Sequence, residues 1–154
     1  MLEFIAGLPP ALHVLVVAAI PVIELRGAIP LGVHLGLPPL EAMALAVVGN
    51  LAPIPLVYYL LLPAVSYLKG TRLFRRLVTS YVARSERESK RIKRYGLPGL
   101  VLFVSIPLPV TGVWTGCLIA LLLGYSPART MLALTLGAVV AGSIVTALAL
   151  LAVG

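Results

Sequence analysis

Two long apolar stretches, residues 4–68 and 97–153, lie on either side of a strongly polar segment. Each stretch opens with a part that prolines, glycines and polar residues interrupt, at about 4–35 and 97–123. Each then ends in one uninterrupted apolar run, and a transmembrane helix needs about 20 such residues. The pattern therefore predicts two membrane-spanning helices, each preceded by a broken apolar segment. The predicted spans are residues 40–62 and 128–153.

The composition agrees with this pattern. Of the 154 residues, 60% are hydrophobic and 11% are charged, whereas about a quarter of the residues of soluble domains are charged. We therefore expect an all-α integral membrane protein, formed as a single membrane domain over residues 1–154, and exclude both a water-soluble domain and a large multi-domain transporter. The N-terminal apolar stretch lacks the marks of a secretory signal and is expected to belong to the fold.

The two stretches resemble each other internally. Residues 35–50, LGLPPLEAMALAVVGN, align with residues 123–138, LGYSPARTMLALTLGA, at a constant offset of 88. The alignment pairs two glycines, a proline and a methionine in each copy, and the two breaks also correspond, with Arg26-Gly27 opposite Thr111-Gly112. We interpret this as an internal repeat, with repeat one at 4–68 and repeat two at 97–153.

Each broken segment is either one kinked span or a re-entrant hairpin that enters the membrane to mid-depth and leaves on the same side. In the hairpin arrangement the second repeat is inverted relative to the first, which places Arg129 on the cytoplasmic side as the charge rule favours. We therefore expect two re-entrant hairpins, each followed by a transmembrane helix, with both chain ends outside. Four plain spans would place both ends inside.

The polar segment between the stretches is strongly basic. Ten of the twelve lysines and arginines lie between Lys69 and Arg94, so segment 69–96 is expected to face the cytoplasm. Leu73, Phe74 and Leu77 recur there at helical spacing among arginines, which predicts an interfacial helix that contacts anionic lipid headgroups. The segment lacks a nucleic-acid recognition motif, and we expect no nucleic-acid partner.

The first break contains the only charged residues deep inside an apolar segment, Glu24 and Arg26. An unpaired charge at mid-membrane costs about 2.5–3.5 kcal/mol on insertion scales. An ion pair that only holds the break together is one interpretation, and it requires a non-helical backbone because residues two apart do not face each other on a helix. We favour a functional role, in which the arginine binds a phosphate or carboxylate and the glutamate carries a proton.

The second break is uncharged but rich in hydrogen-bonding groups. Pro107 and Pro109 remove helical hydrogen bonds, and the helix that restarts after the break directs partial positive charge toward mid-membrane, where it favours an anion. Thr111 and Thr115 either contact this ligand or cap the backbone of a tight hairpin. Trp114 either lines a cavity or anchors an interface. Asn50, within the first predicted span, is expected to form a hydrogen bond between helices rather than to contact substrate.

Neither a cofactor nor a metal is expected. Cys117 is the only cysteine, so neither a disulfide nor a Cys/His metal cluster is possible within the chain. No Ser/His/Asp set, phosphate-binding loop or dinucleotide fingerprint is present. We therefore expect that the protein is not an enzyme or an ATP-driven pump.

ELRGAIPLG (24–32), the Gly49-Asn50 pair and IPLPVTGVWTG (106–116) resemble the small multidrug export protein family, which is similar to the DedA/VTT membrane-protein superfamily. This resemblance implies two oppositely oriented re-entrant hairpins, each beside a transmembrane helix, and transport of lipids such as polyprenyl-phosphate carriers or phospholipids, often coupled to protons. Carried over by motif, the resemblance implies a site with two sides. One side is Glu24, Arg26, Gly27 and Pro30, and the other is Pro107, Pro109, Thr111, Gly112, Trp114 and Gly116.

Three functions remain open on the sequence. The leading hypothesis is a transporter or flippase for an anionic amphiphile in a prokaryotic-type cell membrane. The second is a proton-coupled exporter of hydrophobic cations, and the third is a membrane scaffold whose basic helix docks partners. With so few helices to enclose a cavity, we also expect a homodimer.

Overall fold

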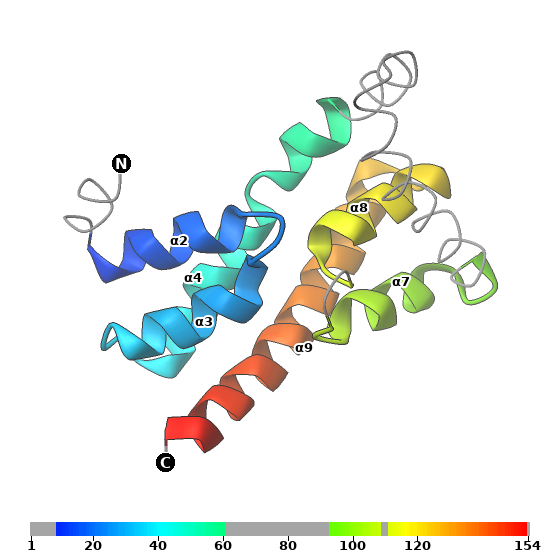
Figure 1. Ribbon diagram of the computed structural model, residues 1–154. Helices are drawn as coiled ribbons and strands as arrows, with labels where there is room; N and C mark the ends of the chain where they lie inside the picture. The colour runs from blue at the N-terminus through cyan, green and yellow to red at the C-terminus, as the bar shows by residue number, and fades with distance from the viewer. Residues whose placement is uncertain (1–8, 61–92, 109–110, 154) are drawn as a thin grey trace, which may run out of the picture.

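The computed structural model describes residues 9–60, 93–108 and 111–153, and every regular element in these ranges is a helix (Figure 1). The predicted all-α class is therefore confirmed for the described part of the chain. The helices are α2 (Pro10–Ala19), α3 (Glu24–His34), α4 (Pro39–Leu51), α7 (Gly96–Ser105), α8 (Val113–Leu122) and α9 (Pro127–Val153).

Two of these helices are long and apolar enough to cross a bilayer. Helix α4 is interrupted at Ala52-Pro53, where proline cannot continue the helical hydrogen bonds, and then resumes, so that Pro39–Leu60 forms a bent apolar helix of 22 residues. Helix α9 has 27 residues. At 1.5 Å per residue these helices are about 33 and 40 Å long, against a hydrocarbon layer of about 30 Å.

The helices of the two broken segments are short. Helices α2, α7 and α8 have 10 residues each and α3 has 11, so each is about 15 Å long, half of the hydrocarbon thickness. Helices α2 and α3 pack against each other and against α4, while α7 and α8 pack against each other and against α9. Helices α3 and α4 also pack against α9, and these contacts join the two halves of the fold (Figure 1).

The same backbone turn follows α3 and α8. After α3, Gly36 has φ +87°, its N–H donates to the Val33 carbonyl, and the Leu37 N–H donates to the Gly32 carbonyl. At positions 88 residues later, Gly124 has φ +69°, its N–H donates to Leu121, and the Tyr125 N–H donates to Ala120. Both are glycine-terminated helix caps in which a left-handed residue satisfies the last carbonyls. The sequence offset of 88 is thus repeated in backbone conformation.

Equivalent glycines bring the short helices close to the long ones. A Cβ on Gly49 of α4 would overlap the backbone of Leu15 in α2, and a Cβ on Gly137 of α9 would overlap the Val104 side chain in α7. These glycines are also 88 residues apart. In each half, the missing side chain lets the first short helix pack closely against the long helix.

Large apolar side chains cover the outer surface of the long helices. On α9, Leu132 is 55% exposed, Leu136 50% and Leu151 79%, and on α4 Leu40 is 73% exposed. Surfaces of this kind are rare in water-soluble monomers and typical of contact with lipid. The core between the helices is built from small and branched residues, among them Val14, Ala28, Ile29, Val104, Ile119, Leu134 and Ala138.

The basic segment predicted at 69–96 falls mainly outside the described residues, as does its interfacial helix. Pro109, a predicted member of the second break, also lies outside them.

Candidate functional site

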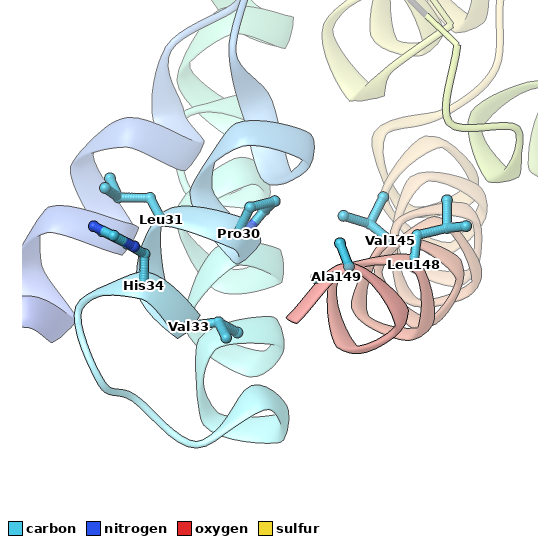
Figure 2. A pocket seen from close by; sticks show the side chains of 8 residues that line it. Pro30, Leu31, Val33, His34, Val145, Leu148 and Ala149 are labelled. Atoms are coloured by element: carbon cyan, nitrogen blue, oxygen red, sulfur yellow. The ribbon is translucent and has the colours of Figure 1, made fainter. Parts of the chain in front are cut away.

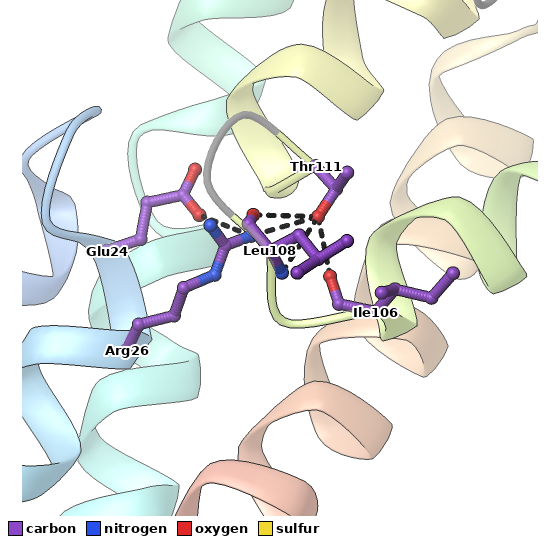
Figure 3. A network of polar contacts seen from close by, with 5 residues as sticks. All are labelled: Glu24, Arg26, Ile106, Leu108 and Thr111. Carbon is purple, nitrogen blue, oxygen red and sulfur yellow. Dashed lines mark hydrogen bonds and ion pairs between the residues drawn. The ribbon is translucent and has the colours of Figure 1, made fainter.

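The two breaks meet at the centre of the described fold. A guanidinium nitrogen of Arg26, Nη2, donates a hydrogen bond to Thr111 Oγ1 at 3.3 Å, across 85 positions of sequence (Figure 3). The same nitrogen lies 3.8 Å from Glu24 Oε2. The charged break of the first half and the uncharged break of the second half therefore form one structure, which we call the polar site. Its residues are Glu24, Arg26, Asn50, Thr111 and Gly112.

Glu24 is buried and has an unusual backbone conformation. It is 5% exposed, and its φ of +53° lies in the left-handed region that side chains disfavour. This departure from regular helix is what allows an ion pair with Arg26 two residues away. A non-glycine residue held in this region costs on the order of 1–3 kcal/mol and persists only where surrounding contacts enforce it, most often at functional sites.

The contact that enforces this conformation is with the N-terminus of α8. The carboxylate of Glu24 accepts a hydrogen bond from the backbone N–H of Trp114. Gly112, the N-cap residue of α8, provides no side-chain cap, and a Cβ at this position would overlap the Glu24 carboxylate. Glu24, from a different part of the chain, therefore caps α8. The partial positive charge at the N-terminus of α8 stabilises its carboxylate.

Thr111 holds the second break in shape. Its hydroxyl donates to carbonyl oxygens of the same loop, Ile106 at 2.5 Å and Leu108 at 2.8 Å, which share one proton. The same oxygen accepts from the N–H of Leu108 at 3.2 Å and from Arg26 (Figure 3). Thr111 therefore does cap backbone, as one interpretation of the sequence suggested, and it also presents an oxygen to the arginine.

Asn50 of α4 completes the polar site, and its expected hydrogen bond between helices is absent among the described residues. The side chain is fully buried, and neither Nδ2 nor Oδ1 has a partner in the described part of the chain. The prediction was wrong: Asn50 lines a narrow pocket with Glu24, Arg26 and Gly112, but neither of its polar atoms forms a hydrogen bond to a group there. An unsatisfied buried polar group costs about 1–3 kcal/mol, and this pocket is too narrow for a water molecule.

The electrostatics of the polar site favour an anion. Among the described residues that line its pocket, Glu24 and Arg26 carry opposite unit charges that cancel. The N-termini of α3 and α8 both lie at the site, at Glu24 and Val113, and each contributes roughly half a positive charge. The sum is net positive.

An apolar groove opens one helical turn from the polar site, between α3 and the C-terminal part of α9 (Figure 2). Its volume is about 800 Å³. Pro30 follows Arg26 by four residues on α3, and Val145 follows Ala141, which lines the polar pocket, by four residues on α9. Residues four apart are neighbours on one helix face, so the groove and the polar site lie next to each other along α3 and α9. The lining residues are Pro30, Leu31, Val33, His34, Val145, Leu148, Ala149 and Ala152.

A family model described as "Putative small multi-drug export protein" matches residues 24–144 of the chain. The chain belongs to this family. The match begins at Glu24 and includes both breaks, the whole polar site and most of α9. No curated protein and no solved structure matches the chain. Together with the two long apolar helices, the match indicates that this small multi-drug export family member is a membrane protein.

The structure places the remaining predicted site residues of this family member at the polar site, in the apolar groove, or in the packing around them. Trp114 contributes its backbone N–H to the polar site, while its buried indole Nε1 lacks a partner among the described residues. Pro30 lines the apolar groove. The others serve packing or lie beside the site: Gly27 faces Ile23, Gly116 faces Leu134 and Val104, Thr115 is buried within α8, and Pro107 lies in the loop before it.

Sequence reasoning did not identify the α9 residues that face the site. Ala141 lines the polar pocket, and Val145 and Leu148 line the groove. These are ordinary apolar residues of an uninterrupted span, so nothing in the local pattern distinguishes them from residues that face lipid. If one of these residues had been known to face the site, their spacing of four and three residues would have placed the other two on the same face of α9.

Proposed function

We propose that this family member transports an amphiphile with an anionic group across the cell membrane. The observation that carries the proposal is the position of a buried, net-positive polar site beside an open apolar groove. Arg26 and the N-terminus of α8 suit an oxyanion. The groove, one turn away, suits an apolar chain of the same molecule.

We propose for the fold two re-entrant hairpins in inverted orientation, each followed by a span. The half-length helices α2, α3, α7 and α8, their side-by-side packing, and the matched turns after α3 and α8 support this arrangement. In this arrangement both breaks lie near mid-membrane, where broken helices of transporters bind substrate. Basic segment 69–96 would then face the cytoplasm and both chain ends would lie outside, which protease or thiol-reagent accessibility at each end tests directly.

Proton coupling is part of the proposal. Glu24 is the one carboxylate among the residues that line the polar pocket, so it is the group there that can exchange a proton with the membrane gradient. The sequence contains no phosphate-binding loop, and we propose transport driven by gradients, without catalysis.

A second candidate is export of hydrophobic cations. The family description favours it, and Glu24 is a buried carboxylate able to pair with a cation. In the structure, however, that carboxylate is already engaged by Arg26 and by α8, so a cation would have to compete with both. A scaffold role for the basic segment is a third candidate, and the residues concerned lie largely outside those described.

Transport assays in proteoliposomes separate these functions. A fluorescent dodecyl phosphate and a fluorescent dodecyltrimethylammonium serve as anionic and cationic probes. We expect Arg26→Ala to abolish movement of the phosphate, and Glu24→Gln to remove its response to a pH gradient while downhill movement continues. Arg129→Ala is the matched control, because Arg129 is exposed at the start of α9, away from the polar site.

The opposite pattern supports the alternatives. Movement of the cationic probe that is lost in Glu24→Gln and kept in Arg26→Ala indicates cation export. If neither probe moves above protein-free vesicles, the transport proposal is wrong and the scaffold role gains support.

We also propose a homodimer and contact of the basic segment with anionic lipid, since the described helices alone do not surround the groove. Crosslinking in native membranes is expected to give a dimer, and recovery of monomer alone would contradict it.

A further inference from the structure

The carboxylate of Glu24 occupies the place where an anionic ligand would bind. It lies at the N-terminus of α8, accepts the Trp114 N–H, and is 3.8 Å from the Arg26 guanidinium. Gly112 leaves space for it, since any side chain there would overlap it. A carboxylate held by a helix N-terminus and an arginine has the surroundings of a bound oxyanion.

Asn50 shows that Glu24 fills this place incompletely. Its amide is fully buried, lines the same pocket, and has neither donor nor acceptor satisfied among the described residues. The Glu24 carboxylate serves the α8 backbone and Arg26, and it forms no hydrogen bond with Asn50. A group with a further oxygen, pointing toward α4, would also accept from Asn50 Nδ2.

We propose that Glu24 is an internal substitute for the phosphate group of the substrate, which displaces it from the N-terminus of α8. The phosphate is then held by the Trp114 N–H, by Arg26 and by Asn50. The donors come from three helices, α8, α3 and α4, and a phosphate has more oxygens than a carboxylate with which to accept from all three. This inference rests on the proposed function and specifies its substrate class: a phosphate joined to an apolar chain that lies in the groove.

Displacement explains three features together. The pocket has no room for even a water molecule while Glu24 is present, so the ligand must replace the carboxylate rather than join it. The left-handed backbone at Glu24 is a strained state that is relieved when the residue moves. The unpaired amide of Asn50 gains its partner only in the bound state.

Binding measurements with Asn50→Leu test the proposal. Leucine has the shape of asparagine without its polar atoms. We expect this variant to be more stable than wild type, because two unsatisfied polar atoms are removed, yet to bind dodecyl phosphate about tenfold more weakly, the equivalent of one hydrogen bond of about 1.4 kcal/mol. A purely structural asparagine would give lower stability and unchanged affinity. Thr146→Val is the matched control: its hydroxyl is also buried without a partner among the described residues, and its removal should leave affinity unchanged.

Glu24→Gln supplies the second arm. Because the competing charge is removed, we expect dodecyl phosphate to bind about tenfold more tightly. Laurate, a carboxylate on a similar chain, should bind more weakly than dodecyl phosphate, and its affinity should not change in Asn50→Leu. Unchanged phosphate affinity in Asn50→Leu, or weaker binding in Glu24→Gln, overturns the inference. If Glu24→Gln does not fold, Asn50→Leu alone decides.

These results are separable from the proposed function. Transport that depends on Arg26 but binding that ignores Asn50 and Glu24 would leave the function standing and refute the displacement. The predicted binding changes without transport in vesicles would support displacement and refute the function.

Discussion

Replacing Gly112 with alanine tests the capping contact between the two halves of the fold. The backbone at Gly112 has φ −87°, a conformation open to any residue, so a change to alanine introduces no backbone strain. Its new methyl group would overlap the Glu24 carboxylate. The carboxylate would therefore have to leave the N-terminus of α8, and the energetic cost of the substitution measures that contact.

The expected loss of stability follows from the contacts of the Glu24 carboxylate. The substitution removes a hydrogen bond between a carboxylate and the Trp114 N–H, and hydrogen bonds to charged groups contribute about 1.5–3 kcal/mol. It also removes the interaction of the anion with the helix end, about 0.3–1 kcal/mol. We expect the free energy of unfolding of Gly112→Ala to fall by about 2–4 kcal/mol.

Reversible unfolding in mixed detergent micelles, followed by circular dichroism, measures this change. Gly142→Ala is the matched control. A Cβ there would lie 3.2 Å from Cγ of Met43, a flexible side chain that can move. Alanine is favoured over glycine in a helix interior by about 0.5–1 kcal/mol, so this control should be neutral or slightly stabilised.

A double-mutant cycle with Glu24→Ala attributes the effect to its cause. In the Glu24→Ala background there is no carboxylate to displace, and Gly112→Ala should cost little. The reasoning is refuted if Gly112→Ala changes stability by less than about 0.5 kcal/mol, or if its cost is the same with and without Glu24, since independent sites add to within about that amount.

Three further substitutions test other parts of the account. Thr111→Val removes the hydroxyl that ties the loop before α8 and should cost about 1–3 kcal/mol in the same unfolding assay, whereas Thr111→Ser should restore most of the loss. Gly49→Ala places a methyl group against the backbone of Leu15 and should cost about 1–3 kcal/mol; a neutral result would mean that α2 does not pack on α4 in this way. Leu148→Trp should partly fill the apolar groove and lower the affinity for dodecyl phosphate about tenfold, the contribution of roughly two buried methylene groups, while binding of butyl phosphate stays unchanged.

Much of the fold was predictable because single glycines and prolines determine where its helices end and restart. Glycines and prolines at an offset of 88 predicted where the helices end and restart, and the structure has α4 and α9 beginning at Pro39 and Pro127 after matched turns. Proline, which cannot donate, and glycine, which tolerates left-handed backbone, act locally. Their effects can therefore be inferred without knowledge of distant contacts.

The composition of the polar site was less predictable, because its contacts join distant segments. The charges at Glu24 and Arg26 indicated a site, but nothing nearby in sequence indicates that Glu24 caps α8 or that Gly112 provides the space. Asn50 was expected to bond to a neighbouring helix, and the structure instead directs it into the polar pocket. The choice between these orientations depends on how α4 is rotated against α3 and α9, which the packing of all three helices decides.

Contact between the two breaks within the membrane is the central claim, and short-range thiol crosslinking tests it most directly. In a Cys117→Ala background, Arg26→Cys combined with Thr111→Cys places one thiol in each of the two segments that the 3.3 Å contact between the arginine and threonine side chains joins. Because a cysteine side chain is several bonds shorter than an arginine side chain, the thiols are bridged with a bis-methanethiosulfonate whose spacer replaces the missing length. Met43→Cys with Ser143→Cys, at a 3.9 Å contact between α4 and α9, is the positive reference. We predict an intramolecular crosslink for both pairs in native membranes. A crosslink for the reference pair alone would show that the breaks lie apart, and would contradict the account.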